Sequence, residues 1–259
     1  MSNKVEAFRA LHIPGDPLVL FNIWDAGSAR AVASAGAKAI ATGSYGVAES
    51  QGFKDGETFP LDRALDVLSG VLRVTDLPVT IDMESGYGLS AEDVGRSVAR
   101  AYEAGAVGIN MEDRMPGVAE LTNIGEQAKR IRAAADTGIF VNARCDVFRG
   151  RPAEAHGPDL VAATLERAMA YAEAGAGSLF VPFTTNRQCI AAICEGSPLP
   201  VNIIWTPASA GGFVSRSELA GLGVARISHG HRPWAAAMQW LAEAAKLTLA
   251  GDAPPYDAG

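Results

Sequence analysis

The sequence has few cysteines, no long apolar run and no basic block. Its three cysteines, Cys145, Cys189 and Cys194, are an odd number without the spacing of metal ligands, which favours a reducing compartment over a disulfide framework. No run reaches the roughly 18 apolar residues that a membrane span requires, and the first residues lack the apolar segment of a signal peptide. We therefore predict a cytoplasmic protein with no membrane partner.

Charge narrows the class of partner. The formal net charge is −7, and the 22 lysines and arginines form no cluster along the chain. We therefore expect neither a nucleic-acid partner nor binding to an anionic membrane. A small anionic substrate would need a local positive charge or a metal ion to bind such an acidic protein.

A repeated pattern of helix, glycine and strand predicts the fold. Gly36, Gly105 and Gly175 each close an amphipathic segment and precede an apolar one, and they are 69 and 70 residues apart. Two strand-helix units of an eightfold barrel take roughly 60–70 residues. We predict one (β/α)8 TIM barrel over residues 1–249, followed by a tail at 250–259. An open doubly wound sheet is the alternative, but no Gly-x-Gly-x-x-Gly follows the first strand. The eight strands are expected at 18–23, 39–44, 79–84, 108–113, 140–146, 178–183, 201–205 and 225–228.

Two short features concern helices. Ser28 is predicted to cap the helix that follows the first strand. The last predicted helix, 233–249, carries Trp234, Met238, Trp240 and Leu241, which is more apolar bulk than an isolated cap needs. A partner surface and ordinary packing on the barrel both explain this composition. Residues 252–259 are expected to be disordered.

The stretch 79–88 carries the strongest sign of chemistry. A β-branched strand ends in Asp82 and Glu84, and the turn Ser85–Gly88 follows. Side chains alternate along a strand, so the two carboxylates share one face at the end where parallel barrels place their active sites. A bound divalent cation is the simplest way to keep both ionised, whereas a solvated strand end is the structural alternative.

Other polar residues fall at neighbouring strand ends. Glu112 ends the fourth strand, and alternation places Asn142, Arg144 and Asp146 on one face of the fifth. A buried arginine beside carboxylates suits a substrate carboxylate or enolate oxygen, although it can also serve only to neutralise those carboxylates. After the second strand, the glycine-flanked turn 43–46 has backbone N–H groups that can hold an anion.

These segments together resemble the isocitrate lyase and phosphoenolpyruvate mutase superfamily. The similarity runs from Phe21 to about Trp240 and rests on five motifs. It implies a barrel whose last helix is exchanged between subunits of a homo-oligomer, a dimer or tetramer. The motifs are Asn22-Ile23-Trp24-Asp25-Ala26-Gly27-Ser28-Ala29-Arg30, Gly43-Ser44-Tyr45-Gly46-Val47-Ala48, Asp82-Met83-Glu84-Ser85-Gly86-Tyr87-Gly88, Gly108-Ile109-Asn110-Met111-Glu112-Asp113 and Asn142-Ala143-Arg144.

The resemblance also implies site residues. Mg²⁺, or alternatively Mn²⁺, would be held by Asp82, partly through waters on Glu84 and Glu112. An additional acid is expected at Asp55, and Ser44 and Gly46 would bind the substrate carboxylate. We assign catalytic roles to Asp55, Tyr45 and Arg144. The predicted substrate-binding residues are Trp24, Ser44, Tyr45, Gly46, Arg144 and Asn202.

The loop after the fourth strand departs from the resemblance. Residues 114–122 contain neither the cysteine of the isocitrate and methylisocitrate lyases nor the lysine of the phosphonopyruvate branch. Decarboxylation asks for less, because carbon dioxide leaves without a general base. We predict a Mg²⁺-dependent carbon–carbon lyase, resembling oxaloacetate decarboxylase or methylisocitrate lyase. It would act on a small anionic 2-oxo or 2-hydroxy acid through a pyruvate enolate. A phosphonopyruvate mutase or hydrolase and a non-catalytic barrel that binds metal and oxo acid are the alternatives.

Three weaker predictions remain. His229 and His231 could act as acids or could be hydrogen-bonded loop residues. Cys145 is expected to pack rather than react. Arg149, Arg151 and His156 are interpreted as a solvated surface.

Overall fold

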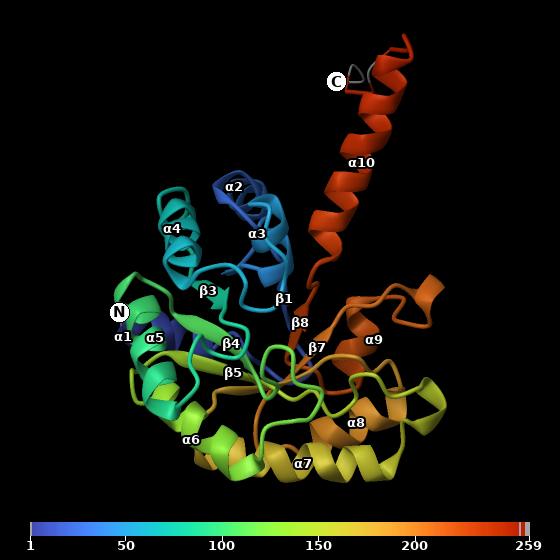
Figure 1. Cartoon of the computed structure of the whole chain (residues 1–259). Coiled ribbons are helices and arrows are strands. Elements are labelled where there is room, and N and C mark those ends of the chain that lie inside the picture. Colours follow the sequence, from blue (N-terminus) through green and yellow to red (C-terminus); the bar gives the residue numbers. More distant parts are fainter. Residues whose placement is uncertain (1, 254, 257–259) are drawn as a thin grey trace.

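The computed structural model describes residues 2–253, 255 and 256, and its eight parallel strands form one barrel (Figure 1). The strand order is β1-β8-β7-β6-β5-β4-β3-β2. A single bridge between Ile23 and Thr42 closes the barrel between β1 and β2. The strands are β1 Leu18–Leu20, β2 Ile40–Ala41, β3 Val79–Asp82, β4 Gly108–Glu112, β5 Phe140–Arg144, β6 Ser178–Val181, β7 Val201–Ile204 and β8 Arg226–Ser228.

The helices surround the barrel, and the (β/α)8 prediction is confirmed. The predicted strands run past the observed ends by three residues in the first and second, by two in the third, fifth and sixth, and by one in the fourth and seventh, because the last residues leave the ladder. The helices are α1 Ser2–Arg9, α2 Ala26–Ser34, α3 Ser44–Ser50, α4 Leu61–Leu72, α5 Ala91–Glu103, α6 Ile124–Ala135, α7 Pro158–Glu173, α8 Arg187–Gly196, α9 Arg216–Gly221 and α10 Arg232–Leu249.

Local sequence explains where the helices begin. At α5, the Ser90 side chain accepts a hydrogen bond from the Asp93 N–H, and the Asp93 carboxylate accepts one from the Ser90 N–H. This capping box satisfies N–H groups that the first helical turn leaves free. A capping box also begins α2, and its N-cap residue is Asp25. The Asp25 side chain accepts from the Ser28 N–H, and the Ser28 hydroxyl oxygen accepts from the Asp25 N–H. The prediction that Ser28 is the cap is therefore wrong, because the helix starts earlier.

The barrel interior contains a polar layer below the cavity. Asn142 Nδ2 donates to Asn110 Oδ1 at 2.8 Å, and Arg226 Nη2 donates to the same oxygen at 3.0 Å. Asn202 Nδ2 donates to Ser228 Oγ at 3.1 Å. All five side chains are buried. Hydrogen bonding within the layer lowers the cost of burying these groups and fixes the strands against one another.

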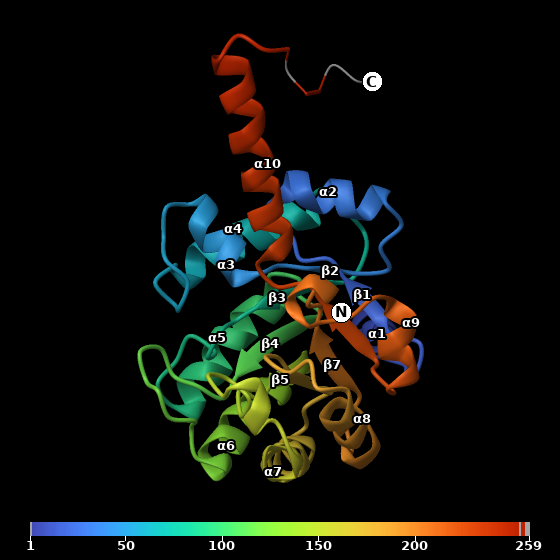
Figure 2. The ribbon, with the colours of Figure 1, turned by 90° about the vertical axis from the view of Figure 1, so that its right-hand side faces the viewer.

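Helix α10 does not pack along the barrel (Figures 1 and 2). Its base is anchored, since Pro233 is buried, but Trp240 is 54% exposed and Leu249 is 88% exposed. Ordinary packing on its own barrel is therefore not the explanation for the apolar residues beyond the base. Residues 254 and 257–259 of the predicted tail lie outside the described residues, and residues 252, 253, 255 and 256 form no helix or strand.

No helix among the described residues is long and apolar enough to cross a membrane.

Candidate active site

A cavity of about 620 Å³ opens at the carboxyl ends of the strands. The turn after β2 contributes Ser44 and Tyr45, the loop after it contributes Asp55, and β3 contributes Asp82. The loop 114–119 after β4 covers another part of the lining. The cavity lies where parallel barrels place their active sites, and most of the predicted residues meet in it.

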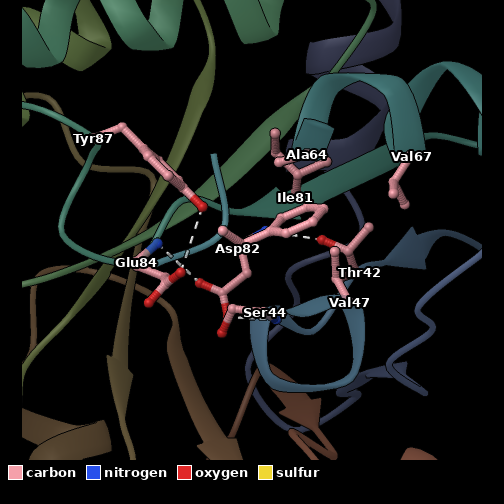
Figure 3. Close-up of a pocket in the computed structure, with 10 residues that line it drawn as sticks. Thr42, Ser44, Val47, Ala64, Val67, Ile81, Asp82, Glu84 and Tyr87 are labelled. Atoms are coloured by element: carbon pink, nitrogen blue, oxygen red, sulfur yellow. Dashed lines mark hydrogen bonds between the residues drawn. The ribbon is translucent and has the colours of Figure 1, made fainter. Parts of the chain in front are cut away.

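Asp82 is held by backbone groups. Its Oδ2 accepts a hydrogen bond from the Ser44 N–H at 3.3 Å, and its Oδ1 accepts one from the Glu84 N–H at 3.2 Å (Figure 3). Burial raises the pKa of this carboxyl, Arg144 opposes that effect, and the charge of Asp55 adds to it. The Asp82 side chain is therefore held in place, and a nearby cation would stabilise its ionised form.

Glu84 lies beside Asp82, as the alternation predicted, but outside the regular strand. Its backbone has a φ of 49°, in the left-handed region that disfavours residues with a Cβ. Its Oε2 accepts from the Glu57 N–H at 2.6 Å, and the Tyr87 hydroxyl lies 3.4 Å from its Oε1. Burial, followed by the charges of Asp82 and Asp55, raises the pKa of Glu84 to about 8.

Glu57 is a site residue that the sequence analysis missed. Its Oε1 accepts from the Ser85 N–H at 2.8 Å and from the Tyr87 N–H at 3.1 Å. With the bond from its own N–H to Glu84, it ties the loop that carries Asp55 to the turn after β3. No local signal identifies this role, because it depends on two loops meeting about 28 residues apart.

Arg144 joins the carboxylates of two strands. Its Nη1 forms an ion pair with Glu112 Oε2, and its Nε and Nη2 donate to Asp146 at 2.7 and 2.9 Å. Burial raises the pKa of Glu112 to about 7 even though Arg144 lowers it. Burial lowers the pKa of Arg144, but Glu112 and Asp146 outweigh that effect and raise it. Arg144 therefore neutralises neighbours, and it also lines the cavity.

Three predicted substrate-binding residues do not line the cavity. Trp24 packs with Val47 and Phe59 in a separate apolar cluster. Asn202 lies in the polar layer and reaches the site only through Ser228. At Gly46, an added Cβ would lie 3.0 Å from the Cβ of Trp234. A direct substrate contact from the Trp24 or Asn202 side chain is therefore not supported, and Gly46 provides room for the base of α10.

The histidines divide into two cases. The ring of His229 lies with its Nδ1 3.2 Å from the Leu20 carbonyl oxygen, and burial lowers its pKa. Of the two roles that the sequence left open for His229, the structure therefore agrees with the hydrogen-bonded loop residue. His231 lines the cavity, with its ring centroid 5.5 Å from that of Tyr45. Cys145 is buried and away from the lining, in agreement with a packing role.

The two arginines of the loop after β5 differ in their place. Arg149 is 45% exposed, as expected for a solvated surface, but it also lines the cavity and donates from Nη1 to Asp146 Oδ2 at 3.1 Å. Arg151, two residues further on, is exposed and does not line the cavity. The difference arises because the loop after β5 turns back over the strand ends.

The residues present fit a hard divalent cation. Among residues 2–253, 255 and 256, no three carboxylate, histidine or cysteine side chains converge closely enough to ligate one metal ion directly. Asp82, Glu84 and Glu112 nevertheless line one cavity, and after burial the charge of Asp82 helps to raise the pKa of Glu84 and of Glu112, whereas the charge of Asp55 helps to raise that of Asp82. Mg²⁺ usually keeps several waters and takes only one or two carboxylates. Asp82 with water held by Glu84 and Glu112 suits that preference.

Comparisons with known proteins agree with the fold and the motifs. The model of the phosphoenolpyruvate phosphomutase family matches residues 8–249. A solved structure from Burkholderia cenocepacia, provisionally described as a phosphonomutase, has a TM-score of 0.91 and 47% identity, over 95% of this chain and 99% of that one.

Two enzymes of known reaction are also similar. 2-Methylisocitrate lyase of Escherichia coli strain K12 is 33% identical over 212 residues, 76% of this chain and 68% of that protein. Oxaloacetate decarboxylase of Rhodopseudomonas palustris is 32% identical over 188 residues, 70% of this chain and 62% of that protein. The chain belongs to the phosphoenolpyruvate phosphomutase family, within the superfamily that also contains the isocitrate and methylisocitrate lyases. Members of this superfamily are lyases or mutases, which supports an enzyme.

Proposed function

We propose that this protein is a Mg²⁺-dependent lyase that cleaves a carbon–carbon bond of a small 2-oxo or 2-hydroxy carboxylic acid. The observation that carries the proposal is the placement of Asp82 and Arg144 on one cavity at the strand ends. A carboxylate that can hold a divalent cation and a permanently charged guanidinium are what a developing enolate requires.

The roles follow from the contacts. Asp82, with water on Glu84 and Glu112, would hold Mg²⁺, which when bound supplies Lewis-acid stabilisation of the enolate oxygen. Arg144 is oriented by two hydrogen bonds to Asp146 and would face the same oxygen or the substrate carboxylate. Ser44 and Tyr45, in the first turn of α3, would position the carboxylate.

Cleavage leaves an electron pair on the carbon that loses its bond, and a proton must be delivered there. With a 2-hydroxy acid the hydroxyl group becomes a carbonyl, so its proton must pass to a carboxylate of the cavity or to water. Loop 114–122 contains no cysteine. Tyr45 and His231 line the cavity side by side and are the candidate donors, and Asp55 is a candidate to assist. Proton delivery from these groups requires no residue of loop 114–122, the loop that differs from that of the isocitrate and methylisocitrate lyases.

The decisive experiment measures pyruvate formation from a panel with Mg²⁺ and with chelator. The panel contains oxaloacetate, methylated oxaloacetates, 2-methylisocitrate and phosphonopyruvate. We expect metal-dependent pyruvate from a carbon substrate, and a loss of about a hundredfold or more in kcat/KM for Asp82→Asn. Asp66→Asn, an exposed carboxylate on α4, is the matched control and should leave turnover unchanged. Turnover that persists in excess chelator would refute the proposal.

A phosphonate enzyme is the second candidate. It is favoured by the 47% identity to the Burkholderia chain and by the arginines of the cavity. Phosphoenolpyruvate or phosphate released from phosphonopyruvate, with no cleavage of the carbon substrates, would establish it instead. Binding of oxalate and pyruvate without turnover of any member of the panel would favour a non-catalytic barrel.

A further inference from the structure

Three arginines of the cavity share one buried carboxylate. Arg114 follows β4, Arg144 ends β5, and Arg149 lies in the loop after β5. Their guanidinium nitrogens lie 3.9, 2.7 and 3.1 Å from the carboxylate oxygens of Asp146, whose side chain is fully buried. A single acid thus brings together the residue after β4 and the segment that runs from the end of β5 into the loop after it.

Two carboxylates do not neutralise the three cations. Asp146 and Glu112 are the acids in contact with these arginines within the described residues, which leaves one positive charge within this group, whereas Asp55, Asp82 and Glu84 line another part of the cavity. A local excess of one sign of charge attracts the opposite sign, and a partly buried charge is screened less than an exposed one.

Hydrogen bonding identifies which arginines remain available. Arg144 commits Nε, Nη1 and Nη2 to Asp146 and Glu112. Arg149 donates one hydrogen bond, from Nη1 to Asp146, and is 45% exposed. Arg114 donates from Nη1 to the Ala119 carbonyl oxygen. Its Nε is buried and has no hydrogen-bond partner among the described residues, since the Asp146 oxygen at 3.9 Å is too far for a hydrogen bond. A guanidinium has five N–H donors, so Arg114 and Arg149 have donors left for a ligand.

Phe183 helps to position this group. The Cζ atoms of Arg144 and Arg149 lie 5.4 and 5.6 Å from the centre of its ring, within cation–π distance. Phe183 lines the cavity and has a φ of 65°, a left-handed conformation that is rare for a bulky residue. Strain of this kind persists where the surroundings enforce it, and it gathers at ligand sites.

We propose that Arg114 and Arg149 form a subsite for a second anionic group of the substrate. The oxo-acid end would lie at Asp82 and Arg144, and the far half would carry a carboxylate or phosphonate whose oxygens the two guanidinium groups bind. The assignment of the oxo-acid end rests on the proposed function. Loop 114–122 contains no lysine, so Arg114 supplies the positive charge on this side of the opening.

The test is binding, which needs no turnover. In the presence of Mg²⁺, isothermal titration compares 2-oxoglutarate with 2-oxopentanoate and 2-oxoadipate with 2-oxohexanoate, pairs that differ only in the distal carboxylate. A third comparison, of phosphonopyruvate with 2-oxobutyrate, tests whether the subsite binds a distal phosphonate. We expect one charged member to bind about tenfold or more tightly than its uncharged partner, because a hydrogen-bonded charge pair is gained.

Variants separate the subsite from general effects. Arg149→Gln and Arg114→Gln should each reduce the preference to below about threefold while the Kd of oxalate stays within about twofold, since oxalate occupies only the other end. Arg149→Lys should keep part of the preference, because it retains charge without the fork. Arg151→Gln, exposed in the same loop, is the matched control and should change nothing.

Three results would overturn the subsite. They are equal affinities within every pair for the wild type, a preference that survives both glutamine variants, and loss of oxalate binding in both Arg149→Gln and Arg149→Lys. If the protein shows the binding preference but turns over no substrate, the subsite is supported and the proposed lyase function is refuted. If it forms pyruvate but shows no preference in any pair, the lyase function is supported and the subsite is refuted.

Discussion

At the scale of residues, His12 is a titratable group away from the cavity whose pKa is changed by burial. Its ring stacks on Phe140, with centroids 4.5 Å apart, at the amino end of β5. Its Nδ1 lies 3.0 Å from the Phe8 carbonyl oxygen. Burial, and then the charge of Arg226, lower its pKa to about 3. His12 is therefore neutral in the folded protein at every ordinary pH.

This shift predicts a loss of stability in acid. The pKa in the folded state lies below the usual histidine value of 6.5, so the unfolded chain takes up the proton first. The contribution is fully present above about pH 6.5 and is lost as the pH falls toward 3. From pH 7 to pH 5, wild type should lose about 2 kcal/mol more of its free energy of unfolding than His12→Phe. Urea unfolding at both values measures this, and equal losses would contradict the assignment.

At the scale of elements, α10 and the barrel leave complementary surfaces open. An apolar groove of about 580 Å³ outside β1 is lined by residues of α2, such as Ala31 and Val32, and by Arg216 at the start of α9. A barrel helix that follows β8 would ordinarily pack in this position, but α10 extends away from the barrel (Figures 1 and 2). We propose that α10 of a second subunit occupies the groove, which agrees with the exchange that the resemblance implied.

The proposed exchange predicts the effect of charges on α10. Trp240 and Leu241 are both more than half exposed, so glutamates at these two positions leave the barrel intact but oppose burial in a partner. Sedimentation velocity should show a lower mass for the double variant Trp240→Glu/Leu241→Glu than for wild type. Gln239→Glu, on the exposed side of the same helix, is the control and should keep the wild-type mass. An unchanged mass in the double variant would remove the exchange.

At the scale of the whole molecule, the carboxylates of the cavity repel one another when they are ionised, and a bound divalent cation would reduce this repulsion. In the metal-free protein, burial raises the pKa of Glu84 to about 8 and that of Glu112 to about 7, both above the usual glutamate value of 4.5. The folded protein therefore binds protons more readily than the unfolded chain between these values. Stability from this source is fully present below about pH 4.5 and is lost as the pH rises through 7 to 8.

Mg²⁺ should reverse this loss. Protons compete with the metal for the same carboxylates, so Mg²⁺ should raise the melting temperature more at pH 8.5 than at pH 6. Thermal unfolding with Mg²⁺ and with chelator at both values measures the increment. Asp82→Asn should abolish it, whereas Asp66→Asn should retain it. The same increment at both values would show that these carboxyls do not compete with protons for the ion.

The sequence by itself determined the barrel and the inner residues of the site. The helix-glycine-strand repeat is local, and parallel strands end together, so Asp82, Glu112 and Arg144 had to meet once eight strands were recognised. Tertiary structure alone decided the rest. Arg114 and Arg149 line the cavity because the loops that carry them turn back over the strand ends, and Glu57 supports it through hydrogen bonds between two loops. Trp24 does not line it, because its ring packs in an apolar cluster. Loop paths and the direction of α10 depend on contacts between distant segments, for which periodicity carries no signal.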